Sequence, residues 1–114
     1  MTEYLFSYGT LQKEKTQIAL FGRPLHGSAD TLRGYRIATI EITDEVFLSK
    51  GEEKSQRTLI LTNNKNDTIK GTVLEVTNEE LAVADAYEPA NYKRINVQLE
   101  SGKHAWIYVA TETT

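Results

Sequence analysis

The chain contains no cysteine. Its composition therefore excludes disulfide bridges, thiolate metal sites and a cysteine nucleophile. It also has no apolar run of about 18 residues, and its first residues are not a basic segment followed by an apolar one. We therefore expect neither a membrane span nor a signal peptide, no membrane partner and a cytoplasmic location.

The sequence also lacks an excess of basic charge. Its 13 Lys and Arg residues face 16 Asp and Glu residues, for a net charge of -3, and no segment concentrates the basic ones. Nucleic acid is therefore not an expected partner. The only histidines, His26 and His104, stand far apart without a companion ligand pattern, and there is no nucleotide-binding motif. We expect no metal and no other cofactor.

What is present is ordinary globular composition, because 39% of the 114 residues are hydrophobic and 25% are charged. This length fits a single domain spanning residues 1–114. Aromatic and β-branched runs predict strands, and two segments predict helices. The expected strands are residues 4–8, 34–42, 58–62, 68–76, 95–99 and 105–110, and the expected helices are residues 11–21 and 78–87. This arrangement is typical of the α+β class.

Turn signals predict how some of these strands pair. The Asn-rich segment 62–68 predicts a hairpin between residues 58–62 and 68–76. The quartet 100–103 predicts a closing hairpin between the last two strands. The polar stretch 50–56 is expected to be exposed.

The second helix has clear end signals. Thr77 followed three residues later by Glu80 has capping-box spacing. Pro89 should end the helix, because proline excludes the preceding residue, Glu88, from helical geometry.

This helix places two carboxylates on one face. Leu81, Ala84, Asp85 and Glu88 follow helical spacing. An acidic, solvated helix end is one reading. In the other, the helix dipole and the charge of Asp85 raise the pKa of Glu88 and make it a proton shuttle. Arg94 can pair with either carboxylate or simply lie on a strand.

The turn Tyr8-Gly9-Thr10-Leu11 also has two readings. Gly9 can simply allow a strand to turn. Alternatively, the backbone N–H groups at this strand end can hold a carboxylate or an oxyanion.

Four segments together resemble the gamma-glutamyl cyclotransferase-like family. They are residues 4–11 (YLFSYGTL), 71–76 (GTVLEV), 85–88 (DAYE) with 92–94 (YKR), and 105–109 (AWIYV). The resemblance implies a small mixed β-barrel flanked by short helices, with a cavity floored by the Tyr8–Leu11 loop. It also implies Glu88 as the general acid/base and Tyr108 near the cavity.

The activity implied by this resemblance is the cyclisation of a γ-glutamyl amine or γ-glutamyl amino acid to 5-oxoproline. Tyr8, Gly9, Thr10, Leu11 and Tyr108 would then bind the small-molecule substrate, with no metal or nucleotide involved.

The sequence departs from the family pattern in two places. Residues 41–46 lack the proline that many members carry, and Pro89 follows the acid/base where a glycine is common. The alternative hypothesis is therefore a non-catalytic domain that binds a small molecule or a protein with the same pocket. Residues 42–56, which match the family least, are where we expect contacts to the leaving amine.

Overall fold

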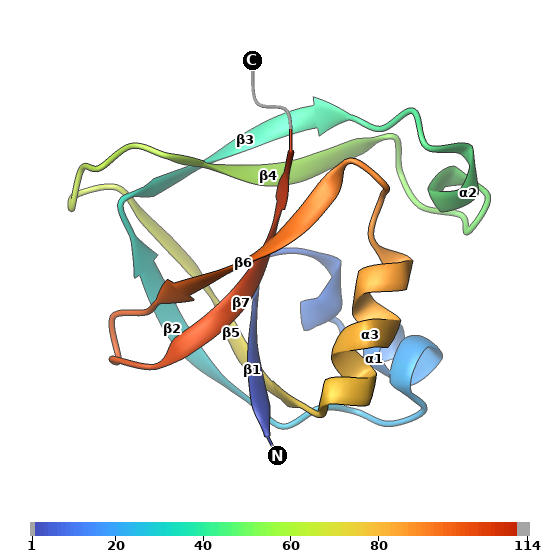
Figure 1. Cartoon of the computed structure of the whole chain (residues 1–114), viewed down its shortest axis with the longest axis horizontal. Coiled ribbons are helices and arrows are strands. Elements are labelled where there is room, and N and C mark those ends of the chain that lie inside the picture. The colour runs from blue at the N-terminus through green and yellow to red at the C-terminus, as the bar shows by residue number, and fades with distance from the viewer. Residues whose placement is uncertain (1, 112–114) are drawn as a thin grey trace.

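The computed structural model describes residues 2–111, which form a five-stranded sheet, a separate strand pair and short helices (Figure 1). In chain order the elements are β1 Glu3–Ser7, the 3-10 helix η1 Thr10–Gln12, α1 Glu14–Phe21, β2 Gly27–Arg33, β3 Tyr35–Glu41, α2 Glu45–Leu48, β4 Ser55–Leu61, β5 Thr68–Val76, α3 Asn78–Tyr87, β6 Tyr92–Gln98 and β7 His104–Ala110.

The main sheet has the strand order β2-β5-β1-β7-β6, and β3 pairs with β4 in a second sheet. β1 runs parallel to β7, and the other pairs are antiparallel. Figure 1 shows β3 and β4 crossing one end of the main sheet. A side chain links the two sheets at that end, because Thr58 Oγ1 accepts a hydrogen bond from the Ala110 N–H at 2.8 Å. The α+β class is confirmed, but the expected barrel is not closed.

One predicted strand pairing is wrong. Residues 58–62 and 68–76 do not form a hairpin, because β4 pairs with β3 and β5 pairs with β2. β2 and β3 are continuous apart from Gly34, whose positive φ of 86° bends the chain. The Asn-rich segment lies opposite this bend, with Thr62 N–H donating to the Gly34 carbonyl and Gly34 N–H donating to the Asp67 carbonyl, both at 2.8 Å. β2 and β3 thus act as one long bent strand, which pairs with β5 along its first half and with β4 along its second half.

The closing hairpin is confirmed, since β6 pairs with β7 in register from Tyr92–Ala110 to Gln98–His104. β2 and the four-residue helix α2 were not predicted. β2 is mostly exposed, which hides the alternation of a half-buried strand, and α2 is too short to show a helical period.

Helix α3 has the predicted bounds. Its capping box is complete, because Glu80 N–H donates to Thr77 Oγ1 at 3.1 Å and Thr77 N–H donates to Glu80 Oε1 at 2.9 Å. Glu88 ends the helix in an extended conformation, with φ of -67° and ψ of 152°. The proline that follows explains this geometry, so the Glu88 side chain leaves the helix direction.

The first predicted helix is split. Lys13 is extended between η1 and α1, and Gly22 ends α1 with a left-handed φ of 74°. The buried side-chain amide of Gln17, within α1, links the chain before this helix to the chain after it. Its Nε2 donates to the Leu11 carbonyl and its Oε1 accepts from the Leu25 N–H, both at 2.8 Å.

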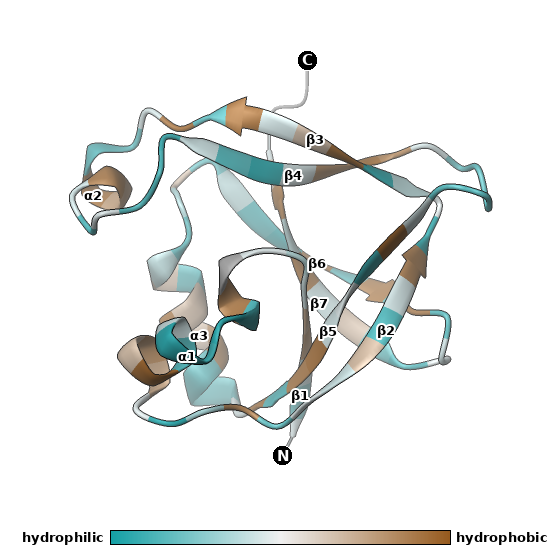
Figure 2. Cartoon of the chain, turned by 180° about the vertical axis from the view of Figure 1, so that it is seen from behind, coloured by the Kyte–Doolittle hydropathy of each residue, from teal (hydrophilic) through white to brown (hydrophobic). Residues whose placement is uncertain are grey.

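The core has two sides because strand side chains alternate. In β7, Ala105, Ile107 and Val109 pack between the sheets, while Trp106 and Tyr108 face the side covered by α1 and α3. Figure 2 shows that β4 is hydrophilic near α2 and hydrophobic in its second half. Within residues 2–111, no helix is both long and apolar enough to cross a bilayer.

Candidate active site

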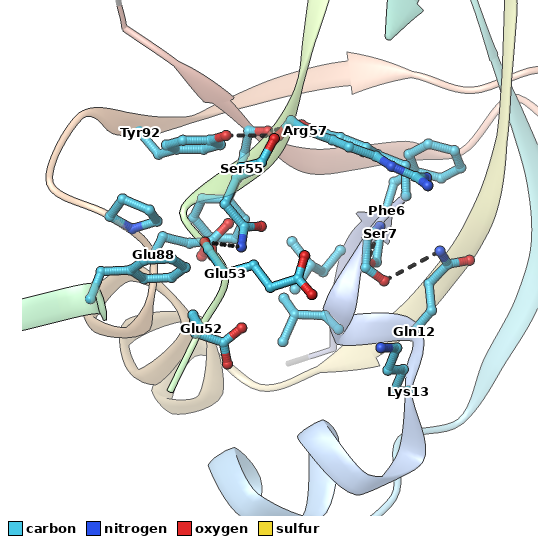
Figure 3. Close-up of a pocket in the computed structure, with 18 of the residues that line it drawn as sticks. Phe6, Ser7, Gln12, Lys13, Glu52, Glu53, Ser55, Arg57, Glu88 and Tyr92 are labelled. Atoms are coloured by element: carbon cyan, nitrogen blue, oxygen red, sulfur yellow. Dashed lines mark hydrogen bonds between the residues drawn. The ribbon is translucent and has the colours of Figure 1, made fainter. Parts of the chain in front are cut away.

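A cavity of about 530 Å³ opens between the loop after β1, the start of β4 and the end of α3 (Figure 3). This volume is typical of a small-molecule site. The cavity is lined by Leu5, Phe6, Ser7, Tyr8, Gly9, Leu11, Gln12, Lys13, Phe47, Gly51, Glu52, Glu53, Ser55, Gln56, Arg57, Glu88, Pro89, Tyr92 and Tyr108.

The structure brings most of the sequence-predicted site residues into this one cavity. Tyr8, Gly9, Leu11, Glu88 and Tyr108 all line it. They come from two parts of the chain that are far apart in sequence, residues 8–11 after β1 and the region from the end of α3 to β7, which the pairing of β1 with β7 brings together. The remaining one, Thr10, begins η1, and its side chain lies outside the described part of the structure.

Glu88 is a half-buried carboxyl whose side-chain oxygens accept no hydrogen bond from any residue in the described range 2–111. The pKa of Glu88 is raised from 4.5 to about 7, mainly by burial and then by the charge of Glu52, while Lys50 opposes the shift and Asp85 adds a smaller increase. The sequence analysis expected a raised pKa for Glu88, and the direction of the shift agrees. The main causes differ, because burial and Glu52 contribute more to the shift than Asp85 does. Glu88 can therefore exchange a proton near neutral pH.

Asp85 lies in different surroundings although it is only one helical turn before Glu88. Its oxygens bind Arg94 through Nε at 3.0 Å and Nη2 at 3.2 Å, and they accept the Tyr108 hydroxyl at 2.7 Å. The Arg94 guanidinium also stacks on the Trp106 ring at 4.3 Å. Of the two carboxylates that Arg94 could have paired with, it binds Asp85 and leaves Glu88 unpaired.

Tyr8 and Tyr92 line the cavity together with Glu88, but their hydroxyls donate to backbone carbonyls and not to the Glu88 carboxylate. The Tyr8 hydroxyl donates to the Tyr108 carbonyl at 2.5 Å, and the Tyr92 hydroxyl donates to the Arg57 carbonyl at 2.7 Å. Burial raises the pKa of both Tyr8 and Tyr92, and the charge of Glu88 raises each further. These hydroxyls therefore stay protonated at neutral pH.

Gly9 is not needed for a turn, which corrects one sequence interpretation. Its φ is not in the left-handed region, and a Cβ added to it would meet no atom within 4 Å. Its N–H has only a long contact of 3.4 Å to Ser7 Oγ. Gly9 thus lines the cavity, and a Cβ at this position would have open space around it.

Sequence reasoning missed several charged lining residues, namely Lys13, Glu52, Glu53 and Arg57. Glu52 and Glu53 lie in the polar stretch 50–56, which was expected to be exposed, and within the wider segment 42–56, where contacts to the leaving amine were expected, but neither glutamate was singled out. Local polarity carried no signal that this stretch folds over the cavity. In the described residues, no group of three or more His, Asp or Glu side chains could hold a metal ion.

Comparisons with known proteins agree with this picture. A family model described as gamma-glutamyl cyclotransferase, AIG2-like matches residues 5–114. No curated protein matches the chain in sequence.

Solved structures share the fold at low sequence identity. One Arabidopsis thaliana protein, solved in solution, matches with a TM-score of 0.73 at 17% identity, over 96% of this chain and 62% of its own. A second matches with a TM-score of 0.75 at 19% identity, over 99% and 71%. A structure named gamma-glutamyl cyclotransferase matches with a TM-score of 0.73 at 14% identity, over 98% and 68%. The chain thus spans about 62% to 71% of the length of these three relatives.

Proposed function

Because the chain belongs to the gamma-glutamyl cyclotransferase, AIG2-like family, we propose that it converts a γ-glutamyl amine or γ-glutamyl amino acid to 5-oxoproline. Glu88 is the general acid/base in this proposal. The amine or amino acid is released.

The reaction rearranges bonds within one substrate and consumes no water. The free α-amine attacks the γ-carbonyl carbon, so that a new C–N bond closes a five-membered lactam. The original γ-amide C–N bond then breaks. The α-nitrogen loses two protons as it changes from an ammonium to a lactam nitrogen, and the departing nitrogen gains two and leaves as an ammonium, so no net proton is released. A single residue that accepts a proton from the α-nitrogen and returns it to the leaving nitrogen can serve each of the two transfers in turn.

Glu88 has the properties that such a residue requires. A pKa of about 7 makes it a stronger base than an ordinary glutamate, while it can still give the proton back. It faces an open cavity, and within the described chain its carboxylate has no hydrogen-bond donor to compete with a substrate ammonium. This unpaired carboxyl with its raised pKa is the observation that carries the proposal.

The loop after β1 supplies the other half of the proposed site. Backbone N–H groups from Gly9 to Leu11 bind the substrate carboxylate or the oxyanion that develops on the γ-carbonyl. Holding the α-amine near that carbonyl favours ring closure, because it removes the entropy cost of bringing the groups together. The open space beside Gly9 lets the substrate approach the loop backbone. Tyr8 and Tyr108 line the same cavity and contact the bound glutamyl unit.

The test is to incubate the protein with a panel of γ-glutamyl amines and amino acids and to detect 5-oxoproline by mass spectrometry. We expect 5-oxoproline from at least one panel member, with no glutamate formed. N-acetylated versions of the same compounds are the substrate control, because their blocked α-nitrogen cannot close the ring.

The variant Glu88→Gln should lower turnover by at least about 100-fold, the usual range for loss of a general acid/base. Glu79→Gln is the matched control, since Glu79 is an exposed glutamate in the first turn of the same helix. Equal turnover by Glu88→Gln and the wild-type protein would overturn the mechanism. Binding of panel compounds without any 5-oxoproline would instead support a non-catalytic binding domain.

A further inference from the structure

The segment from Asp44 to Lys50, which contains α2, is attached to the chain around the end of α3. Asp44 Oδ2 accepts a hydrogen bond from the Ala90 N–H at 2.8 Å. The Lys50 ammonium donates to the carbonyls of Ala86 at 3.3 Å and Tyr87 at 3.2 Å. These are carbonyls at the C-terminal end of the helix, where a cation is favourable. The contacts lie on both sides of Glu88 in the sequence and fix this segment beside it.

Glu52 is held at the same place by a side-chain contact. The Tyr87 hydroxyl donates a hydrogen bond to its carboxylate. Tyr87 is buried in the small core under α2, where it packs edge-on against Phe47 at 5.9 Å between ring centroids. A buried, packed donor restricts where the Glu52 carboxylate can lie. Tyr87 directly precedes Glu88 in the sequence. The position of Tyr87 therefore influences both the Glu88 carboxylate, through the shared backbone, and the Glu52 carboxylate, through the hydrogen bond.

Glu52 and Glu88 line the same cavity, and Figure 3 shows them at one side of the view with Gln12 and Lys13 at the other. The groups that face or influence Glu88 come from five parts of the fold. They are Glu52 and Lys50 from the connection between α2 and β4, Asp85 from α3, Tyr8 from the loop after β1, Tyr92 from β6 and Tyr108 from β7.

These groups do not all act on Glu88 in the same way. The tyrosine hydroxyls are neutral, and Asp85 is paired with Arg94. Glu52 has no cationic partner within 4 Å among the described residues. The connection between α2 and β4 therefore brings two charges of opposite sign near Glu88, the negative charge of Glu52 and the positive charge of Lys50.

The geometry points to Glu52 as a positioning residue for the proposed reaction, held by the Tyr87 hydroxyl so that its carboxylate stands beside Glu88, with Lys50 as the opposing charge. The role in the reaction rests on the proposed function, but the electrostatic arrangement does not. Glu52 itself touches no reacting atom in this scheme.

The chemical consequence is a stronger base. A neighbouring negative charge raises the pKa of Glu88, because it disfavours a second carboxylate charge nearby. Lys50 limits the rise, so that Glu88 still ionises near neutral pH. A glutamate with an ordinary pKa would accept a proton from a substrate ammonium less readily.

The test measures the pKa of Glu88 by NMR titration of its side-chain carboxyl carbon in three variants. Glu52→Gln should lower this pKa by about half a unit or more, and Lys50→Met should raise it by a similar amount. Glu53→Gln is the matched control, because it removes the same charge one residue further along the same cavity wall. It should leave the Glu88 pKa within about 0.2 units of the wild-type value.

Opposite shifts in the first two variants cannot arise from loosening of the segment, which would move both in one direction. Tyr87→Phe provides a second route to the same result, because it releases Glu52 without changing any charge, and it should lower the Glu88 pKa. An unchanged Glu88 pKa in both Glu52→Gln and Tyr87→Phe would overturn the role of Glu52 and leave the cyclotransferase proposal standing. The expected pKa shifts in a protein that forms no 5-oxoproline would overturn the proposed function instead.

Discussion

Arg94 holds both carboxylate oxygens of Asp85, with Nε 3.0 Å from Oδ1 and Nη2 3.2 Å from Oδ2. This bidentate pair decides which of two carboxylates one helical turn apart is available for chemistry. Asp85 is committed to a cation and to the Tyr108 hydroxyl, whereas Glu88 faces the cavity. Asp85, on α3, is thus held in an ion pair, whereas Glu88, the extended residue that ends the helix, carries the carboxyl proposed to react.

The first prediction concerns this division of roles. Asp85→Asn keeps an acceptor for the Tyr108 hydroxyl but removes the ion pair. Because the pair is partly exposed, its loss should cost less than about 1 kcal/mol of the free energy of unfolding. Turnover should fall by less than about tenfold, far less than in Glu88→Gln. Chemical denaturation and 5-oxoproline release measure the two effects, and a larger loss of turnover in Asp85→Asn than in Glu88→Gln would reverse the assignment.

Two glycines give a matched pair of alanine variants. A Cβ on Gly71 would lie 2.5 Å from the Ser7 carbonyl oxygen and 2.8 Å from Phe6 Cζ, so β5 could no longer pack closely against β1. Gly71→Ala should lower the free energy of unfolding by about 2 kcal/mol or more.

Gly9→Ala meets no such contact and should change stability by less than about 0.5 kcal/mol. Its methyl group would occupy space at the cavity floor, and the KM should rise. Equal destabilisation by the two variants, measured by urea denaturation, would show that the Gly9 backbone is constrained after all.

The clear end signals of α3 explain why its bounds could be predicted. Capping residues and proline act over a few positions, so a single sequence reveals them. The pairing of β4 was predicted wrongly because the Asn-rich segment has turn residues whatever lies opposite it. Its partner, Gly34, is far away in the sequence, and only the folded chain shows that the segment faces a bend.

The candidate site divides along the same lines. Glu88 could be proposed as a site residue from helical spacing and from the resemblance to a known family, and the Tyr8–Leu11 loop mainly from that resemblance. Glu52 lies in the segment 42–56, where contacts to the leaving amine were expected, but its relation to Glu88 could not be predicted, because it depends on Tyr87, 35 residues away. Long-range contacts of this kind leave no periodic pattern in the sequence.

Gln17 provides a prediction about the support of the loop. Its buried amide bonds both the Leu11 carbonyl and the Leu25 N–H. Gln17→Leu would leave both groups without a partner and should lower the free energy of unfolding by about 2–4 kcal/mol. The exposed Gln98, with one long contact to Gly102, is the control, and Gln98→Leu should cost less than about 0.5 kcal/mol. A similar small cost in both variants, measured by thermal unfolding, would contradict the supporting role of Gln17.

Glu88 should make the folded protein less stable as the pH rises. Its pKa is about 7 in the folded state against 4.5 for an ordinary glutamate, so the folded protein holds this proton more tightly than the unfolded chain does. The stability contributed by the proton is complete below about pH 4 and is lost as the pH rises from 4.5 to 7.

Glu88→Gln should therefore gain about 3 kcal/mol relative to wild type between about pH 4 and pH 8. Denaturant unfolding of both proteins at the two pH values measures this difference. A gain that is the same at both pH values would mean that Glu88 has an ordinary pKa.

The most direct test of the whole account is the pH dependence of kcat/KM for 5-oxoproline formation by the wild-type protein. Glu88 must be unprotonated to accept the α-ammonium proton, so kcat/KM should fall on the acid side with an apparent pKa near 7. A fall with an apparent pKa near 4.5, or no fall between about pH 5 and pH 8, would contradict Glu88 as a buried general base.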